Sequence, residues 1–101
     1  MKLGRKPTHE HEVLMSAALH VAGRDGYKSM RRDAIAEHAG CSPALISKYF
    51  GTMPQLRRSV MRAAVTRGDS RVLAQGLAAG DANAHEASHG AKRSALAALL
   101  V

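Results

Sequence analysis

Apolar side chains recur at helical spacing along most of this chain. Four segments each place three or four apolar residues on a single helical face. They are Leu14, Ala18, Val21 and Ala22; Ile35, Ala36 and Ala39; Ile46, Tyr49 and Phe50; and Leu56, Val60 and Ala64. Because a helix buries such a face against its neighbours, the pattern predicts an all-α fold with these positions in the core.

Residue types that begin and end helices separate these segments. Gly40 and Gly51 follow the second and third segments, where a glycine commonly ends a helix. Ser42 and Thr52 belong to the residue types that cap a helix N-terminus, and a glutamine three positions after Thr52 completes a capping box. We therefore expect residues 8–65 to form one bundle of four helices.

The two ends of the chain differ from this bundle in composition. Residues 1–7 form a basic arm that contains Lys2, Arg5 and Lys6. Residues 66–101 are rich in Gly, Ala, Asp and Ser, and their apolar residues predict a short helical tail. We expect this tail to complete the core or to hold a dimer together through its larger apolar residues, which are Val72, Leu73, Leu77, Leu96, Leu99 and Leu100.

The charge balance narrows the class of partner. The formal net charge is +7 over 101 residues, with a sequence pI near 10.3. Such a domain favours a polyanion, most often nucleic acid, and the alternative is a solvated basic surface. Cys41 is the only cysteine, so no intrachain disulfide is expected, and a reducing, cytoplasmic location fits. We find no signal peptide and expect no membrane segment.

The segment AGCSPALISKYF, residues 39–50, gives these helices a specific arrangement. A short helix ends at Gly40, a tight turn follows, and the next helix begins after Ser42, which is typical of a helix-turn-helix. The side of that helix opposite the apolar stripe is small and polar. Its small residues Pro43, Ala44 and Ser47 would allow close approach to a DNA groove, and Lys48 would reach a phosphate or a guanine edge.

These segments resemble the DNA-binding domain of TetR-type transcriptional repressors. The similarity covers residues 9–65, through VLMSAALHVAGRDGY, then DAIAEHAGCSPALISKYF, then Leu56. The resemblance implies a dimer that sets two recognition helices in successive major grooves of a palindromic, double-stranded operator. Carried over to this chain, it implies DNA contacts from Arg31, Arg32, Ser42, Pro43, Ala44, Ser47, Lys48, Tyr49 and Thr52, and we add the arm residues Lys2, Arg5 and Lys6.

This chain also departs from the family pattern. Met53 stands where family members often have a phosphate-contacting lysine, and Arg31 and Arg32 supply positive charge in its place. Arg57, Arg58 and Arg62 are interpreted as solvent-facing. About 35 residues follow the bundle, too few to enclose a typical small-molecule pocket, so we expect no inducer and no cofactor. A compact regulator of this kind fits a plasmid or phage.

Three alternatives remain beside the proposed repressor. The sequence HEASH matches the zinc-binding pattern H-E-x-x-H through His85 and His89, with Glu86 as base. Because no further ligand follows, we expect neither a metal site nor an enzyme. The helix-turn-helix could instead serve as a protein-interaction module, or the protein could coat DNA without sequence preference. The preferred interpretation is a sequence-specific repressor that blocks a promoter as a homodimer, and autoregulation fits a regulator of this small size.

Overall fold

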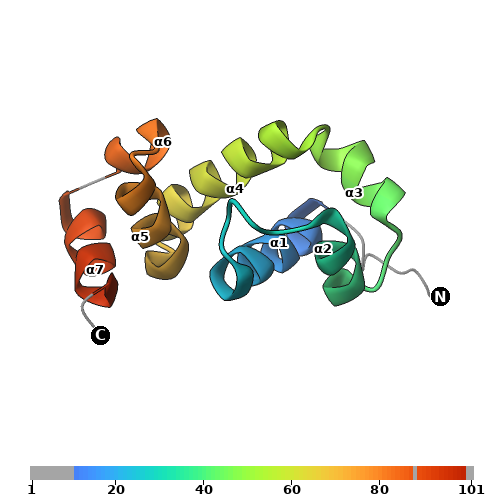
Figure 1. Cartoon of the computed structure of the whole chain (residues 1–101), viewed down its shortest axis with the longest axis horizontal. Helices are drawn as coiled ribbons and strands as arrows, with labels where there is room; N and C mark the ends of the chain where they lie inside the picture. Colours follow the sequence, from blue (N-terminus) through green and yellow to red (C-terminus); the bar gives the residue numbers. More distant parts are fainter. Residues whose placement is uncertain (1–10, 88, 100–101) are drawn as a thin grey trace.

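The computed structural model of this chain describes residues 11–87 and 89–99, and within them every regular element is an α-helix (Figure 1). The helices, in chain order, are α1 (His11–Asp25), α2 (Arg32–Ala39), α3 (Pro43–Phe50), α4 (Met53–Arg67), α5 (Ser70–Ala79), α6 (Ala82–His85) and α7 (His89–Leu99). The predicted all-α fold is confirmed. The arm residues Lys2, Arg5 and Lys6, and Leu100 in the tail, lie outside the described residues.

The helix boundaries follow from the residues that cap them. The Ser42 side chain accepts a hydrogen bond from the Leu45 backbone N–H, with a proline at the first helical position of α3. Thr52 and Gln55 form the predicted capping box at the start of α4. Gly40 ends α2 with a φ of 75°, a conformation that residues with a Cβ rarely adopt. Local chemistry therefore sets the turn between α2 and α3.

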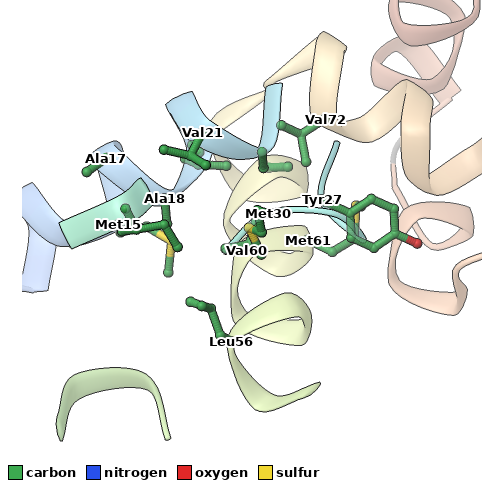
Figure 2. Close-up of a cluster of buried hydrophobic side chains, with 14 of the residues drawn as sticks. Met15, Ala17, Ala18, Val21, Tyr27, Met30, Leu56, Val60, Met61 and Val72 are labelled. Carbon is green, nitrogen blue, oxygen red and sulfur yellow. The ribbon is translucent and has the colours of Figure 1, made fainter. Parts of the chain in front are cut away.

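The first four helices share a core in which α1 packs against both α2 and α4. The side chains drawn in Figure 2 come mainly from α1 and α4, joined by Tyr27 and Met30 from the loop before α2. Most of the apolar residues named from the sequence are buried. Their burial supplies the driving force that holds the short α2 and α3 in place.

The tail continues this core. Val72 of α5 is fully buried and joins the same apolar cluster as α1 and α4 (Figure 2). The Gln75 side chain of α5 accepts a hydrogen bond of 2.7 Å from the Tyr27 N–H and donates one of 3.0 Å to the Ala22 carbonyl. Helix α7 packs against α5 on the other side. Residues of the tail are therefore packed onto the bundle.

The molecule is elongated, with extents of 45 × 25 × 23 Å. Helix α3 lies at one end of the long axis and α7 at the other (Figure 1). No helix in the described part of the chain combines the length and the apolar character needed to cross a membrane.

Candidate nucleic-acid interface

Helix α3 presents a small, polar outer surface and buries its opposite side. Ile46 and Phe50 are buried, whereas the outward positions are exposed or half-buried. Those outward positions are Ser42, Pro43, Ala44, Ser47 and Lys48. The structure therefore brings together, on one exposed surface, the residues that the sequence assigned to the recognition helix.

Tyr49 corrects the predicted apolar stripe, because its side chain is 42% exposed. At 3.6 residues per turn, Tyr49 and Phe50 point roughly 100° apart around α3, and only Phe50 points into the core. Tyr49 lies at the edge, with its ring 6.1 Å from that of His11, which also stands 5.1 Å from Phe50. The Tyr49 side chain is thus accessible beside the outer face of α3.

Two contacts fix the orientation of α3 against its neighbours. At the turn, the Cys41 N–H donates to the Ala36 carbonyl at 2.9 Å. At the far end of α3, the Arg32 Nη2 donates to the Gly51 carbonyl at 3.4 Å. Arg32 therefore links the start of α2 to the end of α3.

The positions expected to contact the DNA backbone lie at the starts of α2 and α4. Arg31 is the N-cap of α2, is exposed, and makes no side-chain capping hydrogen bond. Thr52 is exposed, but its hydroxyl already accepts a hydrogen bond from the Gln55 N–H at 3.3 Å. The same hydroxyl donates to Gln55 Oε1 at 3.2 Å, so it can donate to a phosphate only by giving up that bond.

Arg57 lies in a different environment from the one that the sequence predicts. Arg58 and Arg62 are exposed as predicted, but Arg57 is half-buried, and its Nε is fully buried with no hydrogen-bond partner among the described residues. Arg57 lines a surface pocket of about 400 Å³ between α4 and the segment that leads into α2. The prediction that Arg57 faces solvent was wrong. Helical periodicity shows that Arg57 does not lie on the apolar face of α4, but it does not show that the segment leading into α2 lies beside it.

The apolar tail residues divide between the two roles expected of them. Val72 and Leu73 are fully buried within the single chain, so of the two expected roles they take that of completing the core. Leu77 is half-buried against the core, and Leu96 is 50% exposed. The side chains of Leu99 and Leu100 lie outside the described residues.

The H-E-x-x-H pattern does not lie on one helix. Helix α6 ends at His85, Glu86 is its C-cap, and α7 begins at His89. Among the described residues, no cluster of three His, Cys, Asp or Glu side chains could hold a metal ion.

Burial raises the pKa of the half-buried Cys41 thiol, which keeps it protonated and poorly nucleophilic.

The segment from α1 into α4 is similar in sequence to known bacterial regulators. Residues 14–60 match the family described as bacterial regulatory proteins, tetR family. Over 61 residues the chain is 39% identical to the HTH-type transcriptional regulator BetI of Rhizobium meliloti (strain 1021). That match covers 60% of this chain but only 30% of the relative. No solved structure gives a significant match. The family match runs from α1 into α4 and includes all of α3.

Proposed function

We propose that this protein is a TetR-type regulator that binds operator DNA and represses transcription, and the match of residues 14–60 to the tetR family supports this proposal. The observation that carries the proposal is the outer face of α3. It is exposed, small and basic, on a helix whose opposite side is anchored in the core. Such a helix can enter the major groove without distorting the protein.

Each residue on that face has a proposed role in reading DNA. Pro43, Ala44 and Ser47 are small enough to let the α3 backbone approach the floor of the groove. Lys48 is exposed and long enough to donate to the acceptor atoms of guanine. Arg31, Thr52 and the hydroxyl of the exposed residue Tyr49 would contact phosphates on either side, which positions the helix but reads no sequence.

The proposal includes a dimer and repression by occlusion. Two copies would set their α3 helices in successive major grooves of a palindromic site, and the occupied site would exclude polymerase from the promoter. Because occupancy rises with protein concentration, binding to its own promoter would make the regulator autoregulatory. The plasmid or phage origin stays a prediction that plays no part in this mechanism.

Fluorescence anisotropy with DNA from upstream of the gene, beside scrambled DNA at two salt concentrations, tests the proposal. We expect selective binding that survives moderate salt. Replacing Lys48 with Gln should cost about 1–3 kcal/mol of binding free energy on the selected DNA and much less on scrambled DNA. Arg58→Gln, at an exposed position of α4, is the control.

Two outcomes would contradict the proposal. Equal, salt-labile binding to both DNAs, unchanged in selectivity by Lys48→Gln, would indicate a nonspecific DNA coat. Absence of binding to either DNA at low salt would favour a protein-interaction module instead.

A further inference from the structure

His11 begins α1 and lies against the recognition helix α3. Its ring centroid is 5.1 Å from that of Phe50 and 6.1 Å from that of Tyr49, and the ring planes are tilted by 47° and 59°. Phe50 is buried in the core, whereas Tyr49 is 42% exposed at the edge of α3. One imidazole ring therefore lies beside both the anchored side of α3 and the exposed edge that flanks its outer face.

The strength of this contact depends on the charge of the imidazole. A cation within about 6 Å of an aromatic ring centre is attracted to the ring, because the face of the ring carries negative charge density. Histidine is the side chain that gains or loses its charge between about pH 5 and about pH 8. A proton on His11 therefore adds a cation–π attraction to Tyr49 and Phe50 that the neutral ring lacks.

Charged and titratable groups surround His11 on three helices. On α1, the adjacent Glu12 is already paired with Arg67 of α4 at 2.9 Å. On α3, the ring faces the Tyr49 phenol, and the exposed Lys48 precedes that residue. The phosphates of a DNA molecule on α3 would add a negative potential that the free protein lacks. DNA therefore favours the charged form of His11 relative to the free protein.

We propose that His11 is a proton-linked positioning residue, whose charged form holds Tyr49 in place at the edge of the DNA-binding face. The protein takes up a proton at His11 when it binds DNA. The sign follows from reciprocity: because DNA favours the charged form, the charged form binds DNA more tightly, so affinity rises as the pH falls. This inference rests on the proposed function, since it requires the outer face of α3 to lie on DNA.

The first test measures DNA affinity by fluorescence anisotropy between about pH 8 and about pH 5.5, the range in which histidine titrates. For wild type we expect affinity to rise about 2–5-fold as the pH falls, which is the size of a cation–π contact at an exposed site. His11→Gln cannot take up the proton, so its affinity should lack this rise and stay at the lower level.

Two further variants make the first test specific. His11→Arg carries a permanent charge that stacks on aromatic rings, so it should keep the tighter binding at both ends of the pH range. His85→Gln is the control, because His85 is an exposed histidine on α6, far along the molecule from α3 (Figure 1). It should retain the pH dependence of wild type. Circular dichroism checks that each variant is folded.

The second test asks whether the proton acts through the aromatic contact. Nuclear magnetic resonance follows the ring signals of His11 and Tyr49 in the free protein over the same pH range. We expect the Tyr49 signals to shift with the same midpoint as those of His11, and to stay constant in His11→Gln. Tyr49 signals that ignore the His11 titration would overturn the positioning role, even where DNA affinity depends on pH.

Failure of this inference and failure of the proposed function are distinguishable. If His11→Gln keeps the pH dependence of wild type, or if His11→Arg binds no more tightly than His11→Gln, the inference is wrong, while DNA binding by α3 stands. If the wild type binds neither selected nor scrambled DNA at low salt, the proposed function fails, and proton-linked DNA binding fails with it.

Discussion

At the scale of single residues, Gln75 connects the tail to the helix-turn-helix. Its side-chain oxygen accepts from the Tyr27 N–H at 2.7 Å, and its amide donates to the Ala22 carbonyl at 3.0 Å. Both partners are backbone groups at the end of α1 and in the loop that follows. One half-buried side chain therefore satisfies two backbone groups where the chain leaves α1 for α2.

Replacement of Gln75 with Leu should lower the free energy of unfolding by about 1–3 kcal/mol, because an apolar side chain leaves the Tyr27 N–H without its partner. The Ala22 carbonyl keeps the hydrogen bond of 2.8 Å that it accepts from the Gly26 N–H. Urea denaturation followed by circular dichroism measures the change. Ala78→Gln, at an exposed position of the same helix, should alter stability by no more than about 0.5 kcal/mol. Equal effects of the two substitutions would show that water replaces the Gln75 hydrogen bonds.

At the scale of helices, α5 crosses close to α4 and α6 at Gly76. A Cβ built on Gly76 would lie 2.6 Å from Met61 Cε and 2.7 Å from Ala84 Cβ. The methionine tip can move, but Ala84 Cβ is fixed by the backbone of α6. The missing side chain at Gly76 therefore sets how closely these helices pack.

Gly76→Ala should destabilise the protein even though alanine favours helix. Overpacking costs about 1–3 kcal/mol, which exceeds the gain of about 1 kcal/mol in helix propensity. Gly90 in α7 is the matched control, because a Cβ there meets nothing within 4 Å. Thermal unfolding should show a lower Tm for Gly76→Ala and an unchanged or higher Tm for Gly90→Ala. A higher Tm for both would mean that α5 and α6 separate without cost.

At the scale of helices, the ends of the helices could be predicted from the sequence, whereas the burial of some of their side chains could not. Helix ends at Gly40, Ser42 and Thr52 depend on local capping chemistry, so they could be predicted and are confirmed. The partly buried position of Arg57 and the exposure of Tyr49 depend on which segment covers which helix face. Helical periodicity gives the direction in which a side chain points but not what it meets, so these two could not be predicted.

At the scale of the whole molecule, the long axis limits how a dimer can bind DNA. The radius of gyration is 14.1 Å, above the roughly 13 Å typical of a compact chain of this length. Helices α3 and α7 occupy opposite ends of a 45 Å axis (Figure 1).

Two chains joined in line through α7 would hold their α3 helices too far apart for successive major grooves, whose centres are about 34–36 Å apart. A dimer joined through α7 must therefore be V-shaped, with its two long axes inclined at roughly 45°.

The residue best placed to join such a dimer is Leu96, which lies on α7 and is 50% exposed. Leu96→Glu would put a charge into the apolar contact, and a buried unpaired charge is strongly unfavourable. We expect sedimentation equilibrium to show a dimer for wild type and a monomer for Leu96→Glu at the same concentration. DNA affinity should fall with it, because each half-site would then be bound separately.

Val13→Glu is the control, since Val13 is also a large apolar residue, 40% exposed, but lies on α1 away from α7. It should leave the association state unchanged. If Leu96→Glu remains dimeric and Val13→Glu does not, the chains join through α1 instead. The V-shaped arrangement would then be excluded, because it follows only when the two chains meet at α7, 45 Å along the molecule from α3. The pair of variants therefore decides both which end of the molecule joins the dimer and how its two recognition helices can be spaced.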